Sequence, residues 1–130
     1  MVRLRRNLRF AAVRYPVTYS SCISNNRLNY SVAKQKLDNG QPLVLFVEPY
    51  TISNLSSNES SEKIDMMSDS VAHVMASFGY REITYVLNNG QTRKDTYIQV
   101  STGLSNRSTG YCKIDDGRTT FDEVYAININ

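Results

Sequence analysis

The spacing of apolar residues divides most of the chain into strand-like segments. Residues 2–21 alternate imperfectly between apolar and arginine-rich positions, which predicts a half-buried strand with a charged face. Residues 43–47 form a continuous apolar run between prolines, typical of a strand near the centre of a sheet. Residues 83–87 and 96–100 flank a polar turn with glycine and predict a β-hairpin. After a loop over 101–109, short strands are expected at 111–114 and 121–129.

One segment shows helical spacing instead. A serine at position 60 or 61 suits an N-cap, Glu62 falls in the first turn, and Gly79 stands where a helix commonly ends. The sequence therefore predicts the principal helix of the protein between these residues. Its apolar stripe consists of Ile64, Met67, Val71, Val74, Met75 and Phe78.

The segment after Arg27 fits two structures. Alternation over residues 28–33 favours a second strand, which is the preferred interpretation. Residues 30–37 would also make a short helix that stops at Asn39-Gly40. With either interpretation the pattern predicts an α+β fold: a mainly antiparallel sheet of about six to seven strands with one principal helix.

A chain of 130 residues suits a single domain, here residues 1–130, because either half alone would bury too small a core. A sheet with one helix leaves apolar area uncovered, so we expect a symmetric homodimer in which the helical stripe contacts the partner. No apolar stretch approaches the roughly 20 residues of a membrane helix, and no membrane partner is expected. Cys22 and Cys112 lack metal-ligand spacing and are expected to be buried free thiols.

The net charge of +3 is unevenly distributed. Residues 1–47 hold eight basic side chains against one acidic, which gives +7 and leaves −4 for the remaining chain. A strand with a row of arginines can follow a phosphate backbone, and a free basic arm can bind nucleic acid nonspecifically. The same residues also suit an organelle transit peptide, or a strand edge that charge protects from aggregation. The candidate RNA-binding residues are Arg3, Arg5, Arg9, Arg14, Lys34 and Lys36.

Catalytic chemistry finds little support in the sequence. The one histidine, His73, lies within the predicted helix, where only Asp69 is placed to orient it, so a surface histidine is favoured over a general base. Acidic side chains near the C-terminus fit turns better than a catalytic pair, and no phosphate loop or zinc spacing occurs. We therefore expect no enzyme, no cofactor and no metal. An enzyme built on acids alone would use Asp115, Asp116, Asp122 and Glu123.

The order of hairpin, strands and helix resembles the coat proteins of single-stranded RNA bacteriophages in a circularly permuted arrangement. Residues 83–100, ITYVLNNGQTRKDTYIQV, look like the opening hairpin of that family. Residues 9–16, and residues 42–51 leading towards the helix, look like its later strands and clasping helix.

The resemblance implies a structural coat protein that assembles as dimers into a shell and binds genomic RNA on the basic face of its sheet. It would be part of a virion that assembles in the host cytoplasm. The resemblance also implies a tyrosine that stacks on an unpaired base, for which Tyr15, Tyr30 and Tyr50 are candidates. The alternative is a small soluble basic RNA-binding module, ribosome-associated or organellar, that forms no shell.

Overall fold

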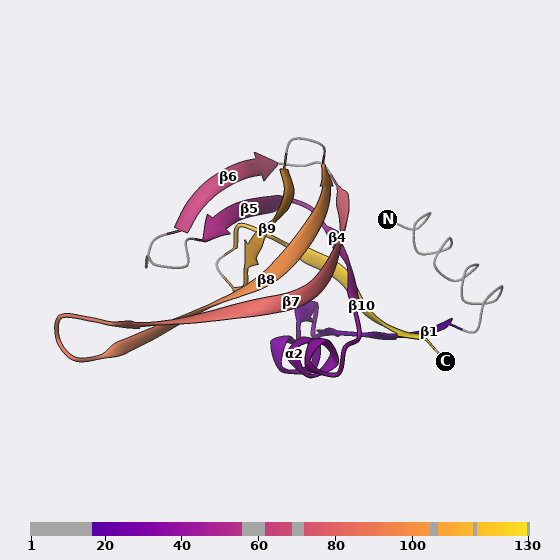
Figure 1. Cartoon of the computed structure of the whole chain (residues 1–130), viewed down its shortest axis with the longest axis horizontal. Helices are drawn as coiled ribbons and strands as arrows, with labels where there is room; N and C mark the ends of the chain where they lie inside the picture. Colours follow the sequence, from indigo (N-terminus) through magenta and orange to yellow (C-terminus); the bar gives the residue numbers. More distant parts are fainter. Residues whose placement is uncertain (1–16, 56–61, 69–71, 105–106, 116, 130) are drawn as a thin grey trace.

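One curved antiparallel sheet dominates the protein (Figure 1). The computed structural model describes residues 17–55, 62–68, 72–104, 107–115 and 117–129. Within these ranges, eight strands lie in the order β1-β10-β4-β7-β8-β9-β5-β6, with a separate ribbon of β2 and β3 and one helix, α2. The α+β class is confirmed, although the sheet has eight strands rather than six or seven. The elements are β1 (Val17–Ser21), β2 (Ile23–Ser24), β3 (Arg27–Leu28), α2 (Tyr30–Asp38), β4 (Leu43–Val47), β5 (Tyr50–Leu55), β6 (Glu62–Ser68), β7 (His73–Val86), β8 (Thr92–Leu104), β9 (Arg107–Lys113) and β10 (Phe121–Ile129).

The core is built around β4, which lies between β10 and β7. Leu45 is fully buried and stands opposite Val124 of β10 and Met75 of β7, both of which are also buried. The continuous apolar run of β4 therefore fits its interior place in the sheet, as the sequence predicted. The closing strand is confirmed with the expected bounds, since β10 covers residues 121–129.

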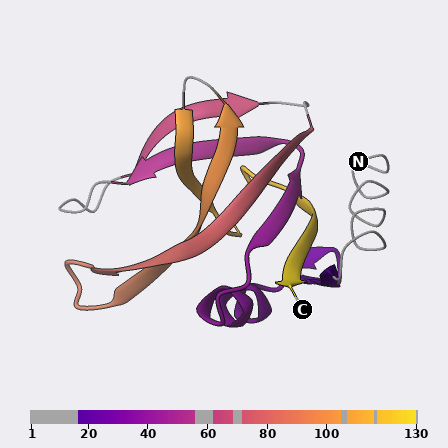
Figure 2. The ribbon, with the colours of Figure 1, turned by 45° about the vertical axis from the view of Figure 1, so that its right-hand side comes forward.

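The opposite half of the sheet curves, and β5 and β6 run at a steep angle to β7 and β8 (Figure 2). Ile52 of β5 and Ile98 of β8 belong to the same buried cluster as Leu45. Strands β5 and β9 approach each other closely at Gly110 of β9, where a Cβ atom would lie 2.3 Å from Cγ2 of Ile52. The cluster also contains Cys22 and Cys112, which are free and buried as expected.

Helix α2 packs against β7 and β4, and its buried residues belong to the core cluster of the sheet. Asn29 caps its first turn, with the Asn29 side-chain oxygen accepting a 3.2 Å hydrogen bond from the Val32 amide. Ala33 and Leu37 are its buried residues, and Gly40, with a φ of +79°, follows its end. The preferred strand over residues 28–33 is therefore wrong, and the alternative helix is correct. The Asn29 side chain stabilises the first turn of the helix, and a left-handed glycine is a common end of a helix.

The principal helix predicted between residues 60 and 79 is wrong. Residues 62–68 form β6, and residues 73–86 form β7. Strand β4 requires a partner on each side, and its residues pair with residues 73–77 of β7. Long-range strand pairing therefore outweighs the local helical spacing. Valine and phenylalanine, which this segment contains, are common in strands.

Strands β7 and β8 continue beyond the rest of the sheet as a long two-stranded ribbon (Figures 1 and 2). We call residues 80–98 the arm; at its base, Tyr97 and Ile98 still pair with β9. Its turn contains Gly90, with a φ of +83°, and the Leu87 amide donates to the Gln91 carbonyl. The predicted hairpin is confirmed in a longer form. The loop expected over residues 101–109 is wrong, because β8 continues to Leu104 and β9 begins at Arg107.

Candidate nucleic-acid interface

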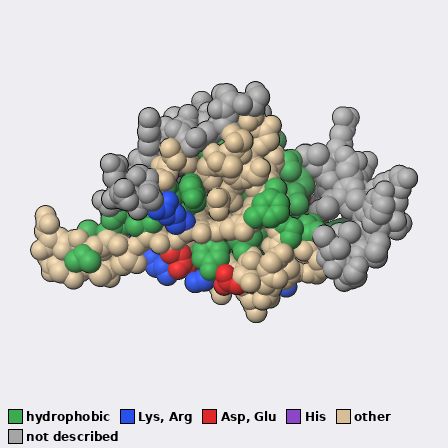
Figure 3. Space-filling model, in the orientation of Figure 1, with side chains coloured by type: hydrophobic (Ala, Val, Ile, Leu, Met, Phe, Trp, Pro, Cys, Tyr) green, Lys and Arg blue, Asp and Glu red, His purple; other side chains and the backbone are tan. Residues whose placement is uncertain are grey.

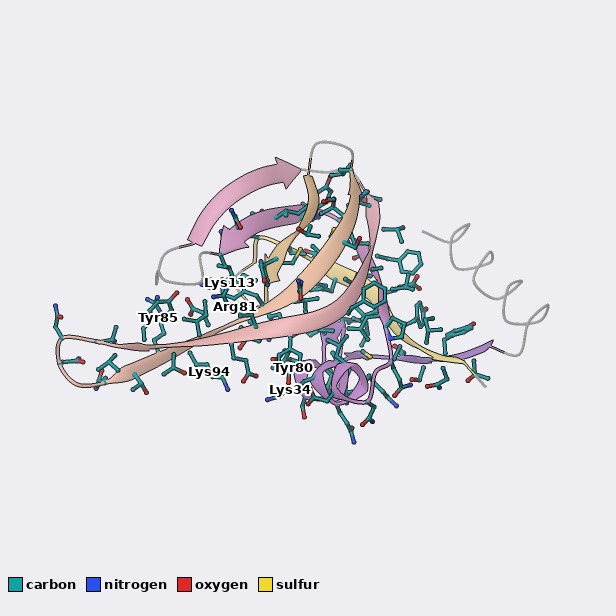
Figure 4. All side chains as sticks on the ribbon, in the orientation of Figure 1. Lys34, Tyr80, Arg81, Tyr85, Lys94 and Lys113 are labelled. Carbon is teal, nitrogen blue, oxygen red and sulfur yellow. The ribbon has the colours of Figure 1, made fainter. Side chains whose placement is uncertain are left out.

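The register of the sheet places basic and aromatic side chains together on the arm. Residues directly opposite each other in an antiparallel pair project to the same side. Tyr85 stands opposite Arg93, while Tyr97 stands opposite both Arg81 and Lys113. Figure 4 shows Arg81, Tyr85 and Lys113 on one side of the arm, and Lys34, Tyr80 and Lys94 on the other. We call the first side the outer face; it includes Arg81, Tyr85, Arg93 and Asp95 of the arm and Tyr111 and Lys113 of the neighbouring strand β9.

Two cations of the outer face lie over tyrosine rings. The guanidinium carbon of Arg93 is 4.5 Å from the centroid of Tyr85, and that of Arg81 is 5.9 Å from the centroid of Tyr111. Arg81 also donates a 3.4 Å hydrogen bond to the Leu55 carbonyl, which ties the arm to the end of β5. Each arginine is therefore held above an aromatic plane at the protein surface. Guanidinium planes and tyrosine rings are both groups on which nucleic-acid bases stack.

Asp95 is the acidic residue of this face. It is 8% exposed and lies between two cations, with Arg93 Nε at 3.3 Å and Lys113 Nζ at 3.4 Å from its carboxylate oxygens. The carboxylate holds both cations in place and neutralises one charge. Three cations against one acid leave a net charge of about +2 on the outer face, a sign that suits a polyanion.

The opposite side of the arm carries a balanced network centred on Glu82. The carboxylate of Glu82 accepts a 2.7 Å hydrogen bond from the Tyr30 hydroxyl and forms ion pairs with Lys34 and Lys94, each at 3.2 Å. Beside it, the Tyr80 hydroxyl donates a 2.7 Å hydrogen bond to Asp38. These contacts join α2 to the arm. Because lysines and acids pair here, this side offers little net attraction to an anion.

The charges of this network are set by the contacts around Glu82. The hydrogen bond from Tyr30, followed by those from Lys34 and Lys94, lowers the pKa of Glu82 from 4.5 to about 2. Burial and the same hydrogen bond to Glu82 raise the pKa of Tyr30. The hydrogen bond to Asp38 raises the pKa of Tyr80. At neutral pH the network therefore holds a charged carboxylate and two neutral phenols.

We expect Glu82→Gln to lower the free energy of unfolding at neutral pH by on the order of 1 kcal/mol. The pKa of Glu82 is depressed by folding, so its contribution is full above the ordinary value of 4.5 and disappears as the pH falls towards 2. The difference between wild type and variant should therefore shrink over that interval. Urea denaturation at a series of pH values measures it. A difference that stays constant down to pH of about 2 would contradict this role for the carboxylate.

The surface charge around the arm also differs between the outer face and the opposite side. Figure 3 shows basic side chains on both sides of the arm, whereas acidic side chains are visible only on its lower side. A hollow of about 320 Å³ opens at the base of the arm, lined by Lys94 and Lys113 and by two aspartates, Asp95 and Asp115. Its charges are balanced, so the hollow is a weaker candidate for an anion site than the outer face.

The predicted RNA-binding residues fall in different places. Arg3, Arg5, Arg9 and Arg14 lie outside the described residues, so their role stays a prediction. Lys34 and Lys36 lie on α2 and not on a sheet face. Lys34 pairs with Glu82, and its Nζ is 5.4 Å from the Tyr80 ring centroid. Neither lysine belongs to the outer face.

The tyrosines proposed for base stacking are also separated. Tyr30 lies on α2 in the Glu82 network. Tyr50 is buried and stacks on the ring of His73 at 5.3 Å. Tyr15 lies outside the described residues. His73 lies on β7 rather than on a helix, and its Nε2 is 2.5 Å from the Thr102 carbonyl oxygen, an arrangement that fits a structural role.

The residues expected at a helical dimer interface do not form one stripe, because the helix is absent. Ile64 and Met67 belong to β6, but their side chains and Val71 lie outside the described part. Val74, Met75 and Phe78 belong to β7. Met75 is 2% exposed and packs in the core of its own chain, whereas Phe78 is 74% exposed. The homodimer stays a prediction, and the helical stripe expected to contact the partner is not formed.

The acidic residues considered for catalysis occupy a turn and a strand. Asp115 adopts a φ of 63° in the turn after β9, and Asp116 is outside the described residues. Asp122 and Glu123 lie on β10, where burial, then the charges of Glu48 and Glu123, raise the pKa of Asp122. Among the described residues, no group of three or more His, Cys, Asp or Glu side chains is arranged to hold a metal ion.

The sequence interpretation overlooked the cations and tyrosines of the outer face. The net charge of the first third drew attention to the N-terminal arginines, whereas the arm lies in the acidic remainder. Arg81 and Tyr85 have the same strand parity, as do Arg93 and Asp95, which was a usable signal in and directly before the predicted hairpin. Only the register with β9 shows that Lys113 and Tyr111 join them.

Comparisons with known proteins return no match among protein-family models, curated proteins or solved structures. The evidence for function therefore comes from this chain alone. In the part of the chain that the structure describes, no helix is long and apolar enough to cross a membrane.

Proposed function

We propose that this protein binds RNA through the outer face of its arm. The observation that carries the proposal is the placement of Arg81, Arg93 and Lys113 on one sheet face with two tyrosines, while the opposite side is neutralised by its own ion pairs. Cations supply most of the affinity of proteins for phosphate backbones, and aromatic rings add contacts to bases. The outer face offers both kinds of group side by side.

The proposal is tested by comparing two adjacent arm residues. Arg93→Gln removes a cation from the outer face, whereas Lys94→Gln removes one from the opposite side and leaves the same net charge. Glu82 keeps Tyr30 and Lys34 as partners in the control, so the link between α2 and the arm remains. Fluorescence anisotropy with labelled RNA over a range of salt concentrations reports affinity and the number of phosphate contacts.

We expect wild-type affinity to fall steeply with salt. Arg93→Gln should weaken binding and reduce the slope of log affinity against log salt by about 1, whereas Lys94→Gln should leave both nearly unchanged. Equal effects of the two variants would mean that only net charge matters and would overturn the assignment to the outer face. Absence of salt-dependent RNA binding would overturn the function itself.

The coat-protein hypothesis is the wider form of this proposal. A shell would need a contact between copies other than the predicted clasping helix, since residues 62–68 and 73–86 are strands. Light scattering of the purified protein, with absorbance at nucleic-acid and protein wavelengths, separates the alternatives. Large particles with nuclease-protected RNA support a coat protein, whereas a 14.8 kDa monomer that binds RNA supports the soluble module.

A further inference from the structure

The outer face contains two similar places at which a base can stack. Each consists of a tyrosine ring with an arginine above it: Tyr85 with Arg93, and Tyr111 with Arg81. Tyr111 is further oriented by an edge-to-face contact with Tyr97, whose centroid is 6.4 Å away. Both rings are half-buried, so part of each ring remains accessible to solvent.

The two places are far apart along the strand direction. Tyr85 stands opposite position 93 of β8, and Tyr111 stands opposite position 99. Six residues of strand span about 20 Å. Lys113, opposite Tyr97, lies between the two tyrosines along the strand direction. A ligand that contacts both rings therefore passes a cation on the way.

This spacing does not suit a double helix. Bases of a duplex are stacked on one another, so their faces are not available to rings on an exposed sheet, and only the backbone and the groove edges could be contacted. A-form RNA also has a major groove too deep and narrow for side chains to read. An unpaired strand can turn individual bases out of line onto separated rings while its phosphates follow the cations between them.

We infer that the outer face selects single-stranded over double-stranded RNA, with Tyr85 and Tyr111 each taking one unpaired base and Lys113 contacting the backbone between them. The inference rests on the proposed function and adds the form of RNA that is bound. Selection comes from the two rings, because the cations alone would attract the phosphates of either form.

The test compares an unstructured RNA of about ten nucleotides with the same strand annealed to its complement. Tyr85→Leu and Tyr111→Leu remove the rings and keep apolar side chains, whereas Tyr85→Phe and Tyr111→Phe keep the rings. We expect wild type to prefer the single strand. Each leucine variant should lose roughly 5- to 150-fold in affinity for it, with an unchanged salt slope, and each phenylalanine variant should bind as wild type does.

The outcomes separate this inference from the proposed function. Equal, salt-dependent binding of both RNA forms, unaffected by the leucine substitutions, would overturn single-strand selection and leave RNA binding intact. Loss of affinity in the phenylalanine variants would show that the tyrosine hydroxyls act rather than the rings, and would overturn stacking. Lack of binding to either RNA would overturn both proposals. Circular dichroism of every variant confirms that the fold is retained.

Discussion

Leu45→Ala is expected to lower the free energy of unfolding by about 2–5 kcal/mol. Leu45 has no exposed surface and stands between Val124 and Met75 on the two neighbouring strands. Truncation removes buried methyl groups and leaves a cavity in an interior strand, where the surrounding sheet can collapse only partly. A loss of this size is a large part of the roughly 5–15 kcal/mol that stabilises a typical domain.

Urea denaturation followed by circular dichroism measures the change, as a lower midpoint with a similar slope. Val86→Ala is the matched control, because it also truncates an apolar side chain, but one that is 76% exposed near the tip of the arm. We expect the control to shift stability by no more than about 0.5 kcal/mol. Similar losses in both variants would contradict the placement of β4 in the core.

Gly110→Ala is expected to destabilise the protein by about 1–3 kcal/mol through overpacking. The new Cβ atom would lie 2.3 Å from Cγ2 of Ile52 and 3.3 Å from the carbonyl oxygen of Ser53. Ile52 is fully buried and its β-branched side chain has few rotamers, so β5 and β9 must move apart. Gly79→Ala is the control, because the atom met there is the end of an exposed glutamine side chain, Gln99.

A double-mutant cycle shows whether the contact with Ile52 is the cause. Ile52→Ala removes Cγ2, so the cost of Gly110→Ala should be smaller in that background than in wild type. Denaturation midpoints of the four proteins give the coupling. Independent, additive losses would indicate that the space around Gly110 is not limited by Ile52.

The outer face illustrates why a site assembled across strands is hard to find in a sequence. Arg81 and Lys113 are 32 positions apart, yet both stand opposite Tyr97. Composition pointed instead to the basic first third, from which Lys34 and Lys36 lie on a helix. Charge counted along the chain takes no account of strand register, which decides the side on which a charge stands.

The amino-acid sequence by itself determined the elements whose local pattern has one solution: the apolar strand at 43–47, the hairpin around Gly90 and the closing strand at 121–129. Tertiary structure decided between helix and strand for residues 62–78, because strand β4 needs a neighbour whatever the local spacing favours. It also decided the composition of the outer face, since strand pairing brings Arg81 and Lys113 together from distant positions. The periodicity of a segment indicates which of its sides is buried, whereas the energy of pairing between distant segments determines which strands become neighbours.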